Sequence, residues 1–371
     1  MRHLFIFGTR PEAIKMAPLI KAFQNDDTQE VIVCVTGQHR EMLDQVLIFF
    51  EIEPQYDLSL MSANQTLFDI TARALIGLKS IIDEVKPSNI FVQGDTTTAF
   101  VGALAGFYEK IPVCHIEAGL RSGNMLSPFP EEGNRKLAGH LATYHFAPTS
   151  RAVDNLRSEG IYNNVYQVGN TVIDALLLGL KLIEQKGEED YKKYFKSIDF
   201  TKKVLLVTGH RRESFGKPFE NMCQAMKDIA LQYPDVQLVY PVHLNPNVRE
   251  VVNEILAGVS NVHLVEPLSY PYLIWLMSKS YFVLTDSGGI QEEAPSLGKP
   301  VLVMRDVTER QEGVDAGTAK LVGTDYDKIL QNAKRLLDDK EYYDTMSNAI
   351  NPYGDGTTSN QILQILINTR K

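Results

Sequence analysis

Two carboxylates in the first half of the chain each stand just beyond the end of a short apolar run. Asp95 follows residues 90–93 across a single glycine, and Glu117 follows residues 113–116 directly. Carboxyl ends of neighbouring parallel strands meet at one edge of a sheet, where proximity and burial can divide two carboxylates into an acid and a base. Asp95 could instead cap the helix after it, and Glu117 could pair with Arg121.

A Pro-punctuated segment, residues 128–135, adds two adjacent acids, Glu131 and Glu132, at the start of a predicted helix. Acidic side chains in a first turn complement the helix dipole, which explains one of the two. We take Glu131 as the candidate for chemistry.

Positive groups occur at two other strand ends. Arg10 and Lys15 lie at and beyond the turn that follows residues 4–7, where a helix start would attract an anion, although no dinucleotide fingerprint is present. In the second half, His210 is followed by two arginines, a pattern suited to a diphosphate or to a helix-start ion cluster. His243 follows residues 236–241 in a similar position.

The strongest motif is Ser287-Gly288-Gly289 after residues 281–285. Bare backbone N–H groups at such a turn can approach a phosphate closely, and the acidic Glu293 about one turn later is placed to accept from a ribose. Three positive residues downstream are candidate charge partners: Arg305, Arg310 and Lys320.

The elements that must position these residues are short strands alternating with helices, a pattern typical of βαβ units and parallel sheets. The strands are predicted at residues 4–7, 31–35, 90–93, 113–116, 144–147, 165–168, 204–208, 236–241, 262–265, 281–285 and 301–304. They form two α/β halves with a crossover near residues 169–171. A charged stretch at 185–203 is predicted as a linker or insertion, and residues 351–356 as a loop before a final helix.

Composition limits the function classes. The chain has 371 residues and a net charge of −9, which does not suit a nucleic-acid backbone or an anionic membrane surface. No run approaches the length of a membrane span, so we expect no membrane insertion. Three separated cysteines, Cys34, Cys114 and Cys223, are predicted to be core residues of a cytoplasmic protein.

The combined motifs resemble the bacterial non-hydrolysing UDP-N-acetylglucosamine 2-epimerase family. The matching motifs run along the whole chain in order: residues 8–18 (GTRPEAIKMAP), 94–98 (GDTTT), 117–121 (EAGLR), 130–132 (PEE), 169–171 (GNT), 210–213 (HRRE), 287–295 (SGGIQEEAP) and 351–356 (NPYGDG). The resemblance implies an α/β fold of the GT-B type, with two Rossmann-like doubly wound domains and an active site in the interdomain cleft. Expected domains are 1–169 plus 357–371, and 170–356. A homodimer is also implied.

The resemblance further implies a reaction, the reversible conversion of UDP-GlcNAc to UDP-ManNAc for surface polysaccharide synthesis. The family eliminates UDP across C1–C2 to a 2-acetamidoglucal and adds it back, which needs neither a metal nor another cofactor. Asp95, Glu117 and Glu131 resemble the acid–base carboxylates and His210 the essential histidine. We expect Asp95 and Glu131 to handle the C2 proton on opposite faces, with Glu117 acting on the leaving oxygen or tuning a neighbour.

The residues that resemble the UDP-sugar-binding set come from both halves: Arg10, Lys15, Asp95, Glu117, His210, Ser287, Gly288, Gly289, Glu293 and Arg310. Regulated relatives bind a second UDP-GlcNAc through residues that resemble Gln38, Arg212 and His243. Glu41 and Asn64 depart from the pattern of those relatives, so regulation is less well supported than catalysis. Gln93 replaces a usual His, and Gln311 replaces a usual Pro.

Three other functions fit parts of this pattern. A glycosyltransferase of the same fold would need an acceptor pocket, and three carboxylates suit proton transfer on one sugar better. A hydrolysing epimerase would release free ManNAc, and a catalytically silent sensor would not need the intact carboxylates and His210.

Overall fold

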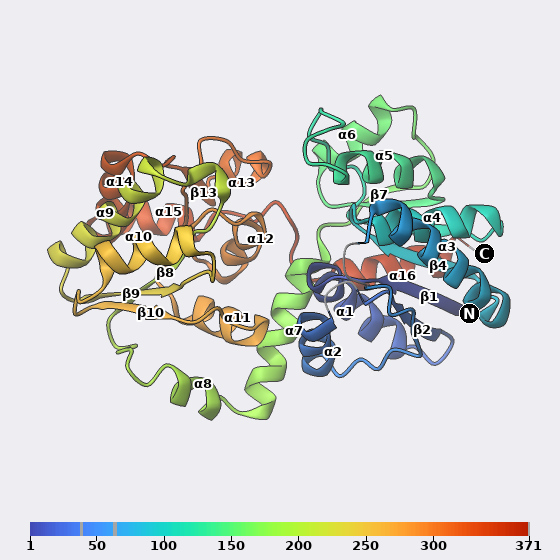
Figure 1. Ribbon diagram of the computed structural model, residues 1–371, viewed down its shortest axis with the longest axis horizontal. Helices are drawn as coiled ribbons and strands as arrows, with labels where there is room; N and C mark the ends of the chain where they lie inside the picture. Colours follow the sequence, from blue (N-terminus) through green and yellow to red (C-terminus); the bar gives the residue numbers. More distant parts are fainter. Residues whose placement is uncertain (38–39, 62–64, 370–371) are drawn as a thin grey trace. The chain divides into compact units, whose positions relative to one another are not determined.

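The computed structural model describes residues 1–37, 40–61 and 65–369. The chain forms two compact units, which we call the first unit (Met1–Leu178 with Tyr353–Lys371) and the second unit (Gly179–Pro352). In each unit helices surround a parallel sheet (Figure 1). The chain passes from the first unit to the second inside helix α7 (Thr171–Lys186).

The first unit contains a seven-stranded sheet in the order β3-β2-β1-β4-β5-β6-β7, with every described strand pair parallel. The strands are β1 (Arg2–Phe7), β2 (Glu30–Val35), β3 (Tyr56–Asp57), β4 (Asn89–Gln93), β5 (Val113–Ile116), β6 (Tyr144–Ala147) and β7 (Val165–Gln167). Six of them match the predicted strands to within two residues at either end. The edge strand β3 was not predicted because two residues are too short to form an apolar run.

The helices of the first unit bury apolar faces against this sheet. Besides the start of α7 they are α1 (Arg10–Gln24), α2 (Arg40–Phe49), α3 (Leu67–Val85), α4 (Thr97–Tyr108), α5 (Glu131–Leu141), α6 (Ser150–Ser158) and α16 (Thr358–Asn368). The C-terminal α16 packs against α1, so the two ends of the chain's sequence share one unit. The start of α16 is anchored to the first unit, because the Thr358 hydroxyl donates to the Val168 carbonyl at 2.9 Å.

The second unit contains a six-stranded parallel sheet in the order β10-β9-β8-β11-β12-β13. The strands are β8 (Lys203–Thr208), β9 (Val236–Pro241), β10 (Val262–Val265), β11 (Phe282–Thr285), β12 (Val301–Val303) and β13 (Ala319–Leu321). Again only the short edge strand, β13, was not predicted.

Helices and two short 3₁₀ turns complete the second unit. They are α8 (Glu189–Tyr194), η1 (Arg212–Ser214), α9 (Lys217–Gln232), α10 (Pro246–Leu256), α11 (Tyr270–Lys279), α12 (Gly288–Glu293), η2 (Ala294–Leu297), α13 (Gln311–Asp315), α14 (Tyr326–Asp338) and α15 (Lys340–Ser347). The charged stretch at 185–203 includes α8 and is anchored, because Phe195 stacks on Trp275 with ring centroids 5.4 Å apart. Among the described helices, none has the length and apolar composition to cross a membrane.

Both sheets reverse their strand order at an inner pair, β1 with β4 in the first unit and β8 with β11 in the second. Adjacent connections leave such a pair in opposite directions, which opens a crevice at the carboxyl ends of the strands where doubly wound proteins bind ligands. The predicted site residues after β4, β8 and β11 stand at these positions.

Candidate functional site

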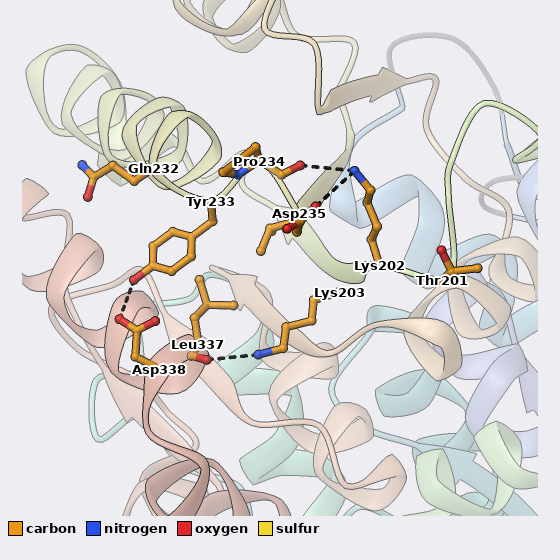
Figure 2. Close-up of a pocket in the computed structure, with 10 residues that line it drawn as sticks. Thr201, Lys202, Lys203, Gln232, Tyr233, Pro234, Asp235, Leu337 and Asp338 are labelled. Carbon is orange, nitrogen blue, oxygen red and sulfur yellow. Dashed lines mark hydrogen bonds and ion pairs between the residues drawn. The ribbon is translucent and has the colours of Figure 1, made fainter.

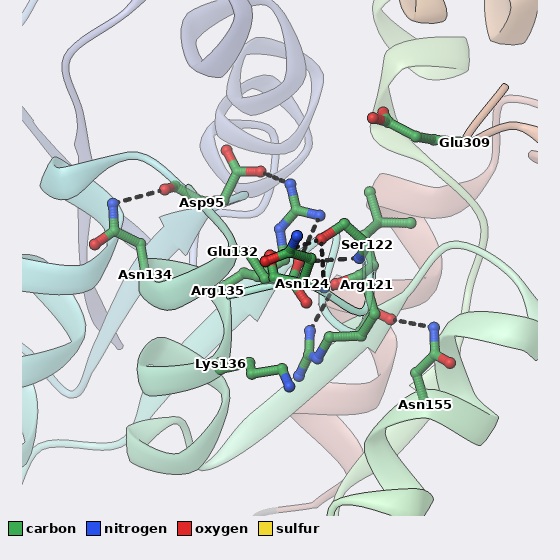
Figure 3. A network of polar contacts seen from close by, with 12 residues as sticks. Asp95, Arg121, Ser122, Asn124, Glu132, Asn134, Arg135, Lys136, Asn155 and Glu309 are labelled. Carbon is green, nitrogen blue, oxygen red and sulfur yellow. Dashed lines mark hydrogen bonds and ion pairs between the residues drawn. The ribbon is translucent and has the colours of Figure 1, made fainter. Parts of the chain in front are cut away.

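Asp95 lies just beyond the carboxyl end of β4, and its side chain does not cap the helix that follows. Gly94 precedes it with φ of +70°, a left-handed conformation that glycine adopts readily. The cap of α4 is Thr96, whose hydroxyl accepts from the Ala99 amide at 3.0 Å. The alternative that Asp95 caps this helix is therefore wrong. Instead its carboxylate pairs with the Arg135 guanidinium, as Figure 3 shows.

Arg135 joins this carboxylate to a second, fully buried one. Its guanidinium lies 3.3 Å from Glu132 Oε2, which also accepts from the Ser122 amide at 3.0 Å (Figure 3). Glu132 Oε1 has no hydrogen-bond partner among the described residues. Glu132 is thus the structural acid of the adjacent pair. Glu131, the first residue of α5, makes no hydrogen bond or ion pair within the described part of the chain and stays free for chemistry.

Glu117, at the carboxyl end of β5, is held by side chains from other elements. Lys15 Nζ lies 2.6 Å from its Oε1, the Asn170 amide donates to the same oxygen at 3.0 Å, and the Gln93 amide donates to Oε2. The proposed pairing with Arg121 is wrong, because the Arg121 guanidinium pairs with another carboxylate, Glu159, at 2.6 Å.

The backbone of Glu117 is unusual as well. Its φ of +61° is in the left-handed region, which costs a non-glycine residue roughly 1 kcal/mol or more. A Cβ placed on Gly94 would be 3.6 Å from Glu117 Oε2, so this carboxylate lies beside the turn that carries Asp95. The sheet therefore brings two of the predicted carboxylates together at adjacent strand ends.

The turn between β1 and α1 places Arg10 and Lys15 on the first helix. Thr9 and Glu12 form a capping box, and the Glu12 carboxylate accepts from the amides of Gly8 and Thr9 at 3.0 and 2.8 Å. Its other oxygen accepts from the Thr96 hydroxyl at 2.6 Å, which ties this turn to the one after β4. Burial raises the pKa of Glu12 despite these hydrogen bonds.

His115 in β5 was not identified from the sequence, although it contacts the same turn. Its Nε2 lies 2.8 Å from the Gly94 carbonyl, to which it donates. Burial lowers the pKa of His115, so the ring is neutral at physiological pH. Asn134 also donates to the Asp95 carbonyl at 3.0 Å. The peptide groups before and after Asp95 are therefore both anchored by side chains. No sequence pattern marks these two residues, since each contacts a backbone carbonyl that is remote in the sequence.

In the second unit the sheet brings the loop after β8 against the residue that follows β11. Thr208 and Thr285 are register partners whose hydroxyls are 2.6 Å apart. Asp286, fully buried, accepts from the backbone amides of His210 and Arg211 at 2.6 and 2.8 Å. Asp286 is a further residue that the sequence did not single out.

His210 and His243 lie together at the ends of β8 and β9. Their rings are stacked with centroids 5.1 Å apart. Desolvation, followed by the neighbouring His210, lowers the pKa of His243. Arg212 is exposed in η1, whereas Gln38 and Asn64 lie outside the described residues. The regulatory assignment of Gln38, Arg212 and His243 stays a prediction.

The Ser287-Gly288-Gly289 turn opens the short helix α12. A Cβ on Gly288 would be 3.2 Å from Cζ of Arg310, so glycine lets that guanidinium lie against the turn. Arg310 is also bonded to the buried Glu292 at 2.8 Å. Glu293, one turn into α12, is buried and accepts from the Tyr270 hydroxyl at 2.9 Å.

Two of the candidate charge partners have other contacts. Arg305 pairs with Glu213 at 2.6 Å, and Lys320 lies 5.8 Å from the ring centroid of Tyr342. Only Arg310 among the three contacts the glycine turn in the described structure. No group of three or more metal-ligating side chains is arranged to hold a metal ion within the described ranges.

A cavity of about 500 Å³ lies at the opposite, amino-terminal end of the second sheet (Figure 2). Its lining includes the first residue of β8, Lys203, and the first residue of β9, Val236. Tyr233 donates to Asp338 at 2.6 Å, and Lys203 donates to the Leu337 carbonyl at 3.0 Å. None of the predicted site residues lines this cavity, so it is separate from the candidate site.

Comparison with known proteins gives consistent matches over the whole chain. A family model described as UDP-N-acetylglucosamine 2-epimerase matches residues 21–367. A UDP-N-acetylglucosamine 2-epimerase of Escherichia coli is 56% identical, over 100% of this chain and 99% of that protein. The crystal structure of UDP-GlcNAc 2-epimerase from Neisseria meningitidis bound to UDP-GlcNAc is 49% identical, with a TM-score of 0.90 and coverage of 99% and 100%. The Methanocaldococcus jannaschii UDP-GlcNAc 2-epimerase in complex with UDP-GlcNAc and UDP is 34% identical, with a TM-score of 0.80 and the same coverage.

Proposed function

This chain belongs to the UDP-N-acetylglucosamine 2-epimerase family, and on that premise we propose that it interconverts UDP-GlcNAc and UDP-ManNAc by elimination and re-addition of UDP. A base removes the proton at C2 as the bond between C1 and the UDP oxygen breaks, and UDP leaves with the electron pair. The resulting 2-acetamidoglucal has a C1=C2 double bond. A proton is then delivered to C2 on the other face while UDP adds back to C1.

The observation that carries this proposal is a set of three carboxylates in the first unit, two just beyond strand ends and one at the start of α5, each in a different environment. Asp95 has its charge compensated by Arg135, Glu117 is bonded to Lys15, and Glu131 has no described partner. General acid–base catalysis needs one group that accepts the C2 proton and another that donates one, and carboxylates with different surroundings can be divided between these two roles. Asp95 and Glu131 are thus the proposed pair that handles the C2 proton on opposite faces.

Glu117 is the proposed partner of the leaving oxygen. Lys15 Nζ and the Asn170 amide both donate to its Oε1, which fixes the carboxylate in one orientation. A group that must act on one oxygen of the substrate benefits from such fixed geometry, because misplacement by about 1 Å costs a large part of the rate.

The UDP-binding residues are proposed to come from Arg10 and Lys15 and from the loops after β8 and β11. UDP departs as an anion, and positive groups that face it stabilise the charge that develops in the transition state. His210 at the end of β8 and Arg310 beside Gly288 are proposed to face the diphosphate, and Ser287 and Gly289 to bind it through the turn. Glu293 is proposed to bind the ribose.

Proton NMR of the reaction in deuterium oxide tests the function. UDP-GlcNAc as the only substrate is expected to give UDP-ManNAc with deuterium at C2, because the removed proton exchanges before re-addition. Free ManNAc would show a hydrolase, and no turnover until an acceptor is added would show a transferase. Either outcome overturns the proposal.

A variant of the proposed base makes the test specific to the site. Asp95→Asn is expected to abolish exchange at C2 while leaving UDP binding largely intact, because the amide cannot take the proton. The matched control is Asp154→Asn on the exposed face of α6, whose side chain is 73% exposed. Wild-type turnover in Asp95→Asn would remove Asp95 from the mechanism.

We also propose that the protein is a homodimer that uses the face formed by α3 and α4. These helices pack side by side, and five of their large apolar side chains are exposed: Leu67, Phe68, Ile76, Phe107 and Tyr108. Association of two copies through this face would remove these apolar side chains from water. Light scattering should give twice the monomer mass for the wild type and the monomer mass for Phe68→Glu with Ile76→Glu. Monomeric wild type would refute the proposal.

The product is proposed to supply ManNAc units to surface polysaccharide synthesis in the cytoplasm. The three cysteines, Cys34, Cys114 and Cys223, are free and buried, as suits a reducing compartment. A strain that lacks this gene should lose ManNAc from its surface polysaccharide and regain it with the wild-type gene.

A further inference from the structure

Asp286 is a buried charge that the proposed chemistry does not yet explain. It follows β11 and has no solvent exposure. Removing a carboxylate from water costs several kcal/mol unless hydrogen bonds compensate it. One oxygen, Oδ2, is fully compensated, because it accepts from the amides of His210 and Arg211 at 2.6 and 2.8 Å. These bonds fix the backbone of the loop after β8.

The second oxygen is in a different position. Asp286 Oδ1 is buried and has no hydrogen-bond partner among the described residues. It lies 3.6 Å from Nδ1 of His210, which is beyond hydrogen-bond distance but within range for a charge pair. A small movement of the imidazole, whose side chain is 42% exposed, would bring Nδ1 within hydrogen-bond distance of Oδ1.

The surroundings leave His210 as the natural partner for this oxygen. The ring of His243 stacks on His210 at 5.1 Å, and its Nδ1 already accepts from the Asn245 amide at 3.1 Å. The buried Tyr240 hydroxyl donates to the Gly209 carbonyl at 2.6 Å, so it is committed elsewhere.

We propose that Asp286 is the positioning residue for His210. Oδ2 holds the loop, and Oδ1 accepts from Nδ1–H of the imidazole when an anionic ligand is bound. Nε2 is then directed away from the carboxylate, as a donor toward the diphosphate. A carboxylate behind a histidine fixes the ring orientation and stabilises its protonated form, as in the Ser-His-Asp arrangement of hydrolases. This inference rests on the proposed function, because it takes UDP as the ligand of His210.

The Asp286→Asn variant separates this role from simple support of the loop. An asparagine has the same shape, and its one carbonyl oxygen can still accept from the two loop amides. Its NH₂ group replaces the unpartnered oxygen and cannot accept from Nδ1–H. Loop support alone therefore predicts nearly unchanged UDP binding, whereas the positioning role predicts a loss.

Calorimetric titration of the full-length protein with UDP measures that loss. Asp286→Asn is expected to weaken UDP binding by about 10- to 100-fold, the range for hydrogen bonds to a charged group. In a His210→Gln background the same change should weaken binding less than about threefold, since the partner is gone. The matched control is Asp235→Asn, whose side chain is 95% exposed in the same unit and should bind UDP as the wild type does.

The outcomes separate this inference from the proposed function. Unchanged UDP binding in Asp286→Asn, or an equal loss in both backgrounds, overturns the positioning role. Wild-type protein that fails to bind UDP overturns the proposed function instead. Nitrogen-15 NMR of the wild type with UDP gives a result that does not depend on any variant folding. The His210 ring should carry a proton on Nδ1, and an unprotonated Nδ1 would refute the proposal.

Discussion

Replacement of Arg135 by methionine removes the only described cation of a three-residue charge cluster. Arg135 contacts both the Asp95 and Glu132 carboxylates, and Glu132 is fully buried. Methionine keeps most of the aliphatic volume, so the perturbation is chiefly electrostatic. Two carboxylates then remain at the site, with no cation from α5 between them.

The expected loss of stability follows from the burial of each partner. Removing one member of a buried ion pair costs about 3–5 kcal/mol because the other charge is left uncompensated. The Arg135 side chain is 14% exposed and that of Asp95 is 29% exposed. We therefore take the lower end, about 3 kcal/mol, which for a unit of this size lowers Tm by roughly 6–12 °C.

Calorimetry combined with hydrogen exchange on peptides from β4 and α5 assigns the change to the first unit. Adding Glu132→Gln to Arg135→Met should recover at least about half of the lost stability, because the buried charge is removed. The matched control is Arg157→Met, which breaks an exposed pair with Asp154 and should cost less than about 1 kcal/mol. A loss of under about 1 kcal/mol in Arg135→Met, or no recovery in the double variant, would refute this reasoning.

Three further predictions follow from other contacts. Gln93→Met removes a hydrogen bond to Glu117 and should lower kcat by about 10- to 100-fold with little change in the Kd for UDP, and an unchanged kcat would contradict the positioning of Glu117. Burial, followed by a neighbouring histidine, lowers the pKa of His145 to about 4. Between about pH 6.5 and pH 4 this histidine is protonated in the unfolded chain but not in the folded chain. The free energy of unfolding should therefore drop by up to about 2 kcal/mol between pH 7 and pH 5. Denaturant titrations should show a smaller drop in His145→Gln, and an equal drop would exclude His145 as the source. Gly288→Ala places a methyl group 3.2 Å from Cζ of Arg310 and should weaken UDP binding in calorimetry, whereas wild-type affinity would show that the guanidinium moves at no cost.

The family predicted from the ordered motifs is confirmed by the family model and by the full-length relatives. The two Rossmann-like domains are confirmed by two parallel sheets whose strand orders reverse at β1/β4 and β8/β11. These features could be predicted because strands buried on both faces form continuous apolar runs, which are visible in a short stretch of sequence. The two-residue edge strand β3 and the short β13 lack that signal.

The partners of the site residues could not be predicted in this way. The sequence offered local contacts, a helix cap for Asp95 and a pairing with Arg121 for Glu117, and both are wrong. The observed partners are remote, since Asp95 and Arg135 are 40 residues apart and Glu117 and Lys15 are 102 apart. The same is true of Asp286 and His210, 76 residues apart.

The sequence by itself thus determined which residue types stand at the strand ends, because strand periodicity and turn chemistry are local properties of the chain. Tertiary structure alone decided which carboxylates are compensated and which is free. The reason is physical: the ionisation and orientation of a side chain depend on charges and donors within a few ångströms, and the order of strands in the sheet selects those neighbours. Glu131 and Glu132, adjacent in sequence, show the difference, since one has no described partner and the other is buried against Arg135.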